Sequence, residues 1–172
     1  MRALISASIG IIFSAAMFAA MPVQAAKPAS PIANKVGTYK VVIDRSVSMD
    51  DATESMRLRA NALNLKLVAE LPLSKQVEAV TGKPQRTITI FQFCDAVTAK
   101  DLIDLNPDFS VYMPCRIALI EAPDGQGWLV MMDVNVEAIA KSKNLAPALK
   151  ARVNAVRNSL IEIMQAGATG AL

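Results

Sequence analysis

Two cysteines, Cys94 and Cys115, carry the most reactive side chains of this 172-residue chain. Each lies at the end of a predicted strand, and a predicted short helix separates them. An even number of cysteines in an exported chain predicts a disulfide, because compartments outside the cytoplasm are oxidising. A Cys94–Cys115 bond would close a loop and stabilise the fold by about 3 kcal/mol.

The same two residues also permit thiol chemistry. Cys94 directly precedes a predicted helix, whose dipole lowers the pKa of a nearby thiol, and Arg116 is placed to do the same for Cys115. Against this, the spacing is not C-x-x-C, Asp95 adds a negative charge beside Cys94, and there is no histidine to act as a base. A redox role is therefore an alternative to the structural disulfide.

A soft-metal site is the third interpretation, since thiolate and thioether groups are suitable ligands for such metals. The candidate metal ligands are Cys94, Cys115 and Met113, with Met131 and Met132 in reserve. They would suit Cu(I) or a haem iron better than zinc, for which too few ligands are left. Methionine on a strand is more often a core residue than a ligand.

The absence of histidine excludes several classes of site. A histidine-based catalytic triad, a His-ligated zinc and the C-x-x-C-H attachment of a c-type haem all require that residue. Asp44, Asp95, Glu121 and Asp133 lie at or near predicted strand ends, but nothing in the sequence brings two of them together as acid and base. The seven glycines form neither of the phosphate-binding patterns G-x-G-x-x-G and G-x-x-x-x-G-K. A non-enzymatic protein is therefore favoured over an enzyme.

The start of the chain has the composition of a secretory signal peptide. Arg2 gives a positive start, residues 3–20 are apolar, and Val23 and Ala25 occupy the small-residue positions before a cleavage site. A membrane anchor is the alternative, because the apolar run approaches the roughly 20 residues of a bilayer span, but Pro22 favours cleavage. We expect a periplasmic or secreted protein with no membrane span after cleavage.

The sequence then divides into a signal peptide at 1–25, a disordered leader at 26–36 and a single domain at 37–168. Cleavage removes one of the 18 basic residues and none of the 15 acidic ones, so the formal charge of the mature chain is 17 minus 15, or +2. The basic residues are dispersed rather than gathered in a stripe. Nucleic acid is therefore not the expected partner.

Apolar spacing predicts a mixed α+β domain with a mainly antiparallel sheet whose helices cover one face. Strands are expected at 39–45 and 86–93, and a hairpin at 111–121 and 128–132 around a turn at 123–127. Helices are expected at 51–71, 96–105, 136–140 and 147–166. The pattern does not assign the structure of residues 72–85.

Several residues around the two cysteines match a known family. They are Ile90-Phe91-Gln92-Phe93-Cys94-Asp95, Asn106-Pro107, Met113-Pro114-Cys115-Arg116-Ile117-Ala118-Leu119-Ile120-Glu121, Asp124-Gly125 and Trp128. From about Tyr39 to Ala166 the chain resembles the bacterial and archaeal "domain of unknown function 302" family, DUF302. The resemblance implies a β-α-β-β-β-β-α order, similar to the TATA-binding-protein-like fold, and association as a homodimer. It brings no established activity.

We therefore expect a non-enzymatic, exported domain that binds a small ligand or a protein partner and carries a Cys94–Cys115 disulfide. The alternative is a thiol-redox, Cu(I) or haem-iron handling protein that uses the same cysteines. The candidate neighbours of the ligand site are Asp95, Met113, Pro114, Arg116 and Glu121. The sequence names neither the ligand nor a cofactor.

Overall fold

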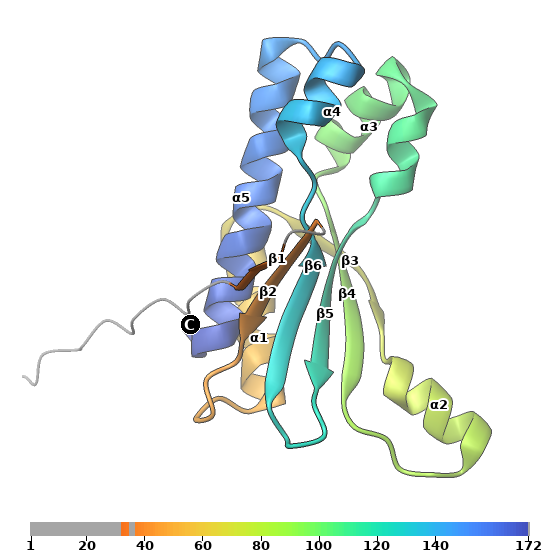
Figure 1. Ribbon diagram of the computed structural model, residues 1–172, viewed down its shortest axis with the longest axis vertical. Helices are drawn as coiled ribbons and strands as arrows, with labels where there is room; N and C mark the ends of the chain where they lie inside the picture. The colour runs from red at the N-terminus through yellow and green to blue at the C-terminus, as the bar shows by residue number, and fades with distance from the viewer. Residues whose placement is uncertain (1–31, 35–36, 172) are drawn as a thin grey trace, which may run out of the picture.

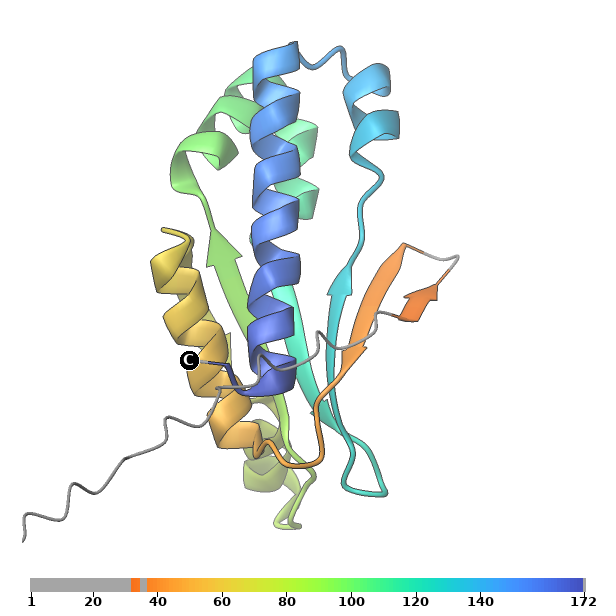
Figure 2. The same ribbon diagram turned by 90° about the vertical axis from the view of Figure 1, so that its left-hand side faces the viewer.

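Six strands form one antiparallel sheet in the order β1-β2-β6-β5-β4-β3, and two helices, α1 and α5, cover one of its faces (Figure 1, Figure 2). The structure is a computed structural model that describes residues 32–34 and 37–171. The strands are β1 (Ile32–Asn34), β2 (Thr38–Val42), β3 (Lys66–Leu71), β4 (Ile88–Cys94), β5 (Cys115–Glu121) and β6 (Gly127–Met132). The helices are α1 (Met49–Ala62), α2 (Leu73–Thr81), α3 (Ala96–Leu105), the 3-10 helix η1 (Pro107–Tyr112), α4 (Val136–Ser142) and α5 (Pro147–Thr169).

The α+β class and the one-sided antiparallel sheet predicted from the sequence are confirmed. The expected β-α-β-β-β-β-α order corresponds to β2, α1, β3, β4, β5, β6 and α5, with the other helices inserted between strands. The short strand β1 lies within the segment predicted as a disordered leader, and it pairs with β2. The predicted signal peptide lies outside the described residues. Among residues 32–34 and 37–171, no helix has the length and apolar character needed to cross a membrane.

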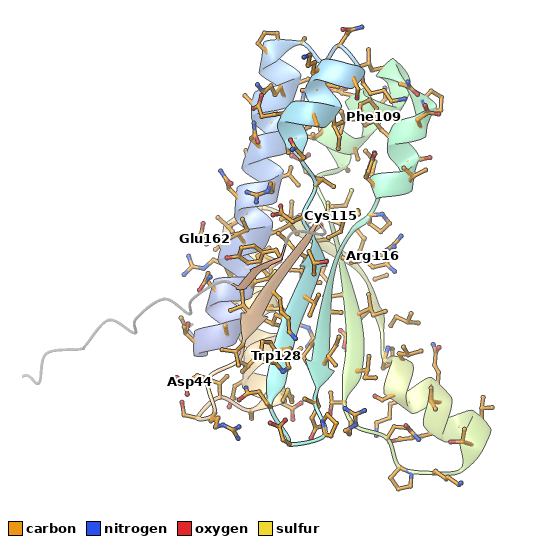
Figure 3. The ribbon with its side chains drawn as sticks, in the orientation of Figure 1. Asp44, Phe109, Cys115, Arg116, Trp128 and Glu162 are labelled. Atoms are coloured by element: carbon orange, nitrogen blue, oxygen red, sulfur yellow. The ribbon has the colours of Figure 1, made fainter. Side chains whose placement is uncertain are left out.

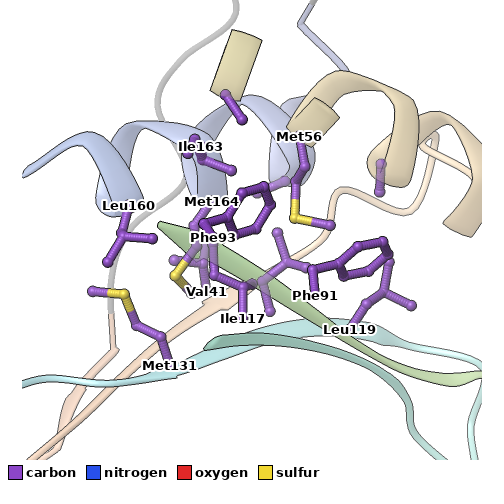
Figure 4. Packing of buried hydrophobic residues seen from close by; sticks show 14 of the residues in the cluster. Val41, Met56, Phe91, Phe93, Ile117, Leu119, Met131, Leu160, Ile163 and Met164 are labelled. Atoms are coloured by element: carbon purple, nitrogen blue, oxygen red, sulfur yellow. The ribbon is translucent and has the colours of Figure 1, made fainter. Parts of the chain in front are cut away.

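The core lies between the sheet and helices α1 and α5 (Figure 4). Alternate residues of the central strands face these helices and are almost completely buried, as expected where one face of a sheet is covered. The fully buried set from the strands is Val41, Phe91, Phe93, Ile117, Leu119 and Leu129. Met56 of α1 and Ile163 and Met164 of α5 close the core from the helix side.

The prediction of one helix from 51 to 71 is wrong, because α1 ends at Ala62. Asn64 adopts a left-handed conformation with φ of 55°, and the amide of Leu65 donates to the Ala60 carbonyl oxygen at 2.9 Å. The chain then reverses into β3, where Leu67 pairs with Phe93. Leu67 had continued the apolar helical spacing, but it packs against the core from a strand.

Strand β3 forms one edge of the sheet and is irregular. Its pairing with β4 shifts between Leu67 and Ala69, so Val68 sits in a bulge and is 54% exposed. Residues 72–85, whose structure the sequence did not assign, contain helix α2. This helix ends at Gly82, which has φ of 65°. A left-handed residue at this position is a common way to end a helix, and glycine adopts it without strain.

Helix α5 is longer than predicted and runs beyond the end of the sheet (Figure 2). Its buried residues all lie in its second half, from Leu160 onward, where it covers the sheet. Its first half contacts α3 and α4, which together with η1 gather beyond the strand ends (Figure 1). Residues of the strand ends, α5, α3 and η1 line one cavity in this part of the molecule.

Candidate functional site

A cavity of about 200 Å³ lies where β4 ends and β5 begins. Its wall combines strand ends with residues of α3, η1 and α5, and most of the wall is apolar. The apolar side chains that contribute include Leu102, Met113, Met131, Val156 and Leu160. The polar ones are Cys94, Asp95, Thr98, Cys115, Arg116 and Arg157, together with the hydroxyl of Tyr112. Cys115 and Arg116 are labelled at the start of β5 in Figure 3.

Asp95 fixes the start of α3 at one side of the cavity. Its carboxylate accepts hydrogen bonds from the amides of Val97 at 3.1 Å and Thr98 at 3.0 Å, and from the Thr98 hydroxyl at 3.0 Å. These bonds satisfy amide groups that have no partner within the helix. The backbone bond from Thr98 is the largest cause that lowers the pKa of Asp95, so this carboxyl is ionised near neutral pH.

The chain passes from α3 to β5 through η1. Asn106 caps η1, since its side-chain oxygen accepts a hydrogen bond from the Asp108 amide at 2.9 Å. Pro107 and Asp108 are the first two residues of this 3-10 helix. The peptide bond between Met113 and Pro114 is cis, and β5 starts at the next residue. Met113 and Pro114 therefore line the cavity as the chain enters the sheet.

The two cysteines belong to opposite faces of the sheet. Cys115 pairs with Phe93, so its side chain shares the helix-covered face with that buried phenylalanine. Cys94 follows Phe93 directly, and successive side chains of a strand point to opposite faces. Cysteines whose Cβ atoms point apart cannot be bridged without backbone movement. Both are free thiols, and the predicted disulfide is not formed in the structure.

Burial raises the pKa of both thiols. The charge of Asp95 adds to this effect at Cys94, and the charge that an ionised Cys94 would carry adds to it at Cys115. The lowering expected from the helix dipole and from Arg116 is therefore not found. A protonated thiol is a poor nucleophile, so these surroundings do not activate either cysteine.

The candidate metal ligands Cys94, Cys115 and Met113 all line the cavity, and so do Met131 and Met132. Within residues 32–34 and 37–171, no three side chains of the histidine, cysteine, aspartate or glutamate type gather as a metal site. Any metal held here would therefore depend on thioether sulfur atoms as well as on the two thiols.

Of the predicted neighbours of the site, the structure brings together Asp95, Met113, Pro114 and Arg116 around the cavity. Glu121 does not join them, because it ends β5 at the far end of the strand. Its carboxylate accepts a hydrogen bond from the Thr87 amide at 2.9 Å, and its carbonyl oxygen accepts one from Arg86 at 2.7 Å. Glu121 therefore ties together the ends of β4 and β5.

Residues of α3 and α5 form a part of the site that was not expected. Leu102, Val153, Val156 and Leu160 line the cavity and lie on the apolar stripes of the helices predicted at 96–105 and 147–166. Only Leu102 and Leu160 of these are buried. No signal in the sequence separates a stripe that faces a cavity from one that faces a core, because both need apolar side chains at helical spacing.

Three arginines lie in or near the cavity, and two are held by acids. Arg157 donates to Asp133 in a two-pronged pair, and Arg152 donates to Asp101 at 2.6 Å and to the Thr98 hydroxyl at 3.1 Å. Arg116 makes no ion pair with an acid anywhere in residues 37–171. Its guanidinium is the uncompensated positive charge of the cavity.

An antiparallel sheet that is covered by helices on one face, with a small apolar cavity at its strand ends, places this protein in the α+β class. Residues 39–167 match the family described as "Domain of unknown function DUF302", and the chain belongs to that family. The fold is similar to that of a solved structure, "Crystal structure of uncharacterized conserved protein DUF302 from Bacillus stearothermophilus". The likeness has a TM-score of 0.60 at 15% identity and covers 76% of this chain and 97% of that one. No curated protein matches the chain.

Proposed function

We propose that this protein is a non-enzymatic binding domain that holds a small, largely apolar ligand in the cavity between β4, β5, α3 and α5. The observation that carries the proposal is the largely apolar wall of that cavity, to which six elements contribute: β4, α3, η1, β5, β6 and α5. A cavity of about 200 Å³ is a little larger than the roughly 150 Å³ cavity that accommodates benzene in another protein. The ligand is therefore about the size of one ring with a few attached atoms.

The polar groups of the cavity support binding rather than catalysis. Asp95 uses its carboxylate as a helix cap, and its lowered pKa makes it a weak general base. The pKa of each thiol is raised, so neither is an activated nucleophile. A positioned acid and base are what an enzyme of the ordinary hydrolytic kind needs.

The test uses toluene as the probe and methionine methyl NMR as the readout. Met113 and Met131 line the cavity, so toluene should shift their methyl signals in a saturable manner. Ala99→Phe fills the cavity from α3, and Ala155→Phe adds the same ring to an exposed position of α5 outside the cavity wall. We expect Ala99→Phe to abolish the shifts and Ala155→Phe to keep them. Unshifted methionine signals in the unsubstituted protein at saturating toluene would refute the proposal.

Soft-metal binding is the second candidate, favoured by the two thiols and the thioether of Met113 that line one cavity. Cu(I) prefers such ligands, and its binding would displace the thiol protons that burial retains. A porphyrin is too large for a cavity of this volume, so the haem version is not carried further. Titration of the reduced protein with Cu(I) in competition with a chelator tests this role. Unchanged affinity in Cys94→Ser or Cys115→Ser would eliminate it.

We also propose that the protein is exported. The support is the charged start, the apolar run and the small-residue positions before residue 26. Expression of the full chain in a bacterium and mass measurement of the periplasmic product checks this. We expect a mature N-terminus at Ala26, and a full-length product retained in the membrane fraction would contradict it.

Finally, we propose a homodimer in which two copies meet through the part of the helix-free face of the sheet that lies toward the β5–β6 turn, away from Arg116. Most alternate residues in this part of the face are apolar: they are Val42, Ile90, Ala118, Ile120, Trp128 and Val130. Lys40 also lies here, with its ammonium group 3.5 Å from the centre of the Trp128 ring. Val130→Glu places a charge at its centre, and Val80→Glu places one on α2, where Val80 is 87% exposed. Light scattering should give a dimer mass for the unsubstituted protein and Val80→Glu, and a monomer mass for Val130→Glu. A monomer mass for all three would exclude the dimer.

A further inference from the structure

We infer that the ligand of this cavity carries an anionic group, a carboxylate or its equivalent, which is held at the cavity mouth by Arg116. This inference rests on the proposed binding function and adds the chemical class of the ligand. The class is a small aromatic or compact aliphatic acid, with its apolar part inside the cavity. Three features support it: the direction in which the cavity opens, the absence of an acidic partner for Arg116 among the described residues, and the position of Asp95, the one carboxylate in the cavity wall.

The cavity passes from the helix-covered side of the sheet to the helix-free side. Met131 faces the helices and is 4% exposed, whereas the next residue, Met132, faces the other side and is 55% exposed. Arg116 likewise follows Cys115 and belongs to the helix-free face. Since residues of both faces line one cavity, it has a deep end against α5 and a mouth beside Arg116.

The burial of the wall residues agrees with a deep end at α5 and a mouth at Arg116. The deep end is formed by Leu102, Met131 and Leu160, which are buried, together with the buried hydroxyl-bearing Thr98. The exposed wall residues include Val111, Tyr112 and Arg116. An apolar group is therefore stabilised at the deep end, while a charged group can stay hydrated at the mouth.

Arg116 is the cation available to such a group. Arg157 is held by both carboxylate oxygens of Asp133, and Arg152 is held by Asp101, so their guanidinium groups are already compensated. Arg116 has no acidic partner among the described residues. A guanidinium presents two parallel N–H groups that match the two oxygens of a carboxylate.

The remaining titratable groups direct the anion to this side. Asp95 lies on the α3 side of the wall and is ionised, so it repels an anion from there. The thiols of Cys94 and Cys115 stay protonated because their pKa values are raised, so they add no negative charge near Arg116. The favourable position for an anionic group is therefore beside β5.

The experiment compares benzoate with toluene and benzyl alcohol, which keep the ring and lack the charge. Affinities are measured by methionine methyl NMR titration of the full mature chain. The matched variants are Arg116→Gln and Arg45→Gln; Arg45 is an exposed arginine whose ion pair partner, Asp124, lies in the β5–β6 turn. Because Arg116 is exposed, neither substitution is expected to disturb folding, which the methyl spectrum itself verifies.

We expect Arg116→Gln to weaken benzoate binding about tenfold, which corresponds to the loss of one charge-assisted interaction at a surface site. Toluene and benzyl alcohol should bind this variant unchanged, and Arg45→Gln should bind all three as the unsubstituted protein does. Benzoate affinity should also fall with added salt. Equal benzoate affinity in both variants, with toluene still bound, would overturn the inference and leave the proposed function standing. Failure of all three probes to bind would overturn both.

Discussion

Arg157 and Asp133 form a two-pronged ion pair, in which Nε donates to Oδ1 at 2.7 Å and Nη2 donates to Oδ2 at 3.0 Å. The pair joins the middle of α5 to the segment that leaves β6, directly beside the cavity. It raises the pKa of Arg157, and each side chain is about 30% exposed. These two side chains are therefore better protected from solvent, as a pair, than those of the other ion pairs in residues 37–171.

Asp133→Asn should lower the free energy of unfolding by about 1–2 kcal/mol, because it removes charge from a partly buried, hydrogen-bonded pair. The control is Asp104→Asn, which removes the partner of Lys100 on the exposed surface of α3. Such surface pairs contribute little, so this change should stay within about 0.5 kcal/mol. Urea denaturation measures both. Equal effects of the two substitutions would contradict the prediction.

The helix cap at Asp95 predicts a pH dependence of stability. Hydrogen bonds to its charged form lower the pKa of Asp95 below the value of an unfolded aspartate, about 3.9. The ionised carboxylate therefore stabilises the fold above that pH, and the contribution is lost as the pH falls through the pKa of the folded state. Asn is also a good capping residue, so Asp95→Asn removes the titration and keeps the cap.

The stability difference between the unsubstituted protein and Asp95→Asn should thus be largest above about pH 5 and shrink toward pH 3. Urea midpoints across this range provide the measurement. Asp44, Glu78 and Asp108 also have lowered pKa values, but they titrate in both proteins and cancel in the difference. A difference that is constant with pH would show that Asp95 does not act through its charge.

Gly167 is required by the contact between α5 and α1. A Cβ atom there would lie 2.6 Å from Met56 Cγ and 3.0 Å from Leu129 Cδ1. Alanine usually stabilises a helix interior relative to glycine by about 1 kcal/mol, but overpacking a core costs about 1–3 kcal/mol. We expect Gly167→Ala to lower the melting temperature. Ala155→Gly on the exposed side of α5 calibrates the ordinary helix preference, and a higher melting temperature for Gly167→Ala would refute the close contact.

Both cysteines should titrate as free thiols in the purified mature protein. Their raised pKa values predict slow alkylation of the native protein near neutral pH and faster alkylation in urea, where burial is lost. Cys115 should react more slowly than Cys94, because it packs against the core. Single Cys→Ser variants identify the two rates. If no thiol reacts in urea until a reductant is added, the cysteines are bonded and the prediction fails.

Local signals in the sequence were sufficient for much of the fold. Pro147 marks the start of α5, because a proline in the first turn of a helix acts on the backbone of its own position. Alternation predicted the strand at 86–93, where β4 lies, and the apolar runs around the turn at 123–127 predicted β5 and β6. The first hairpin strand was expected from residue 111, but residues 111–112 belong to η1 and β5 starts at Cys115. The α+β class followed from the order of these elements.

The errors arose where contacts between distant residues decide the structure. Leu67 fits both a helical stripe and a strand, and only its pairing with Phe93 selects the strand. The last helix was expected to end at about residue 166, before Gly167, but α5 continues to Thr169, and Gly167 lies inside it in close contact with Met56. In both cases the deciding partner is remote in the sequence.

In the candidate site, too, the residues could be predicted from the sequence, whereas contacts between distant segments could not. Cys94, Asp95, Met113, Pro114, Cys115 and Arg116 were selected together, and all line the cavity. The disulfide was expected from the even number of cysteines. In the structure Cys115 pairs with Phe93, so the side chains of Cys115 and Cys94 lie on opposite faces of the sheet. The contribution of α5 could not be foreseen, because it depends on how far that helix extends past the sheet.

The bulge at Val68 limits how another chain can pair with β3, an edge strand of the sheet. An exposed edge strand offers unpaired N–H and C=O groups to other chains and can start aggregation. The shift between Leu67 and Ala69 interrupts the regular spacing of those groups, and Lys66 and Glu70 add charges of both signs along the same strand. A second chain cannot extend the sheet at β3 in a continuous register, so this edge resists fibril growth.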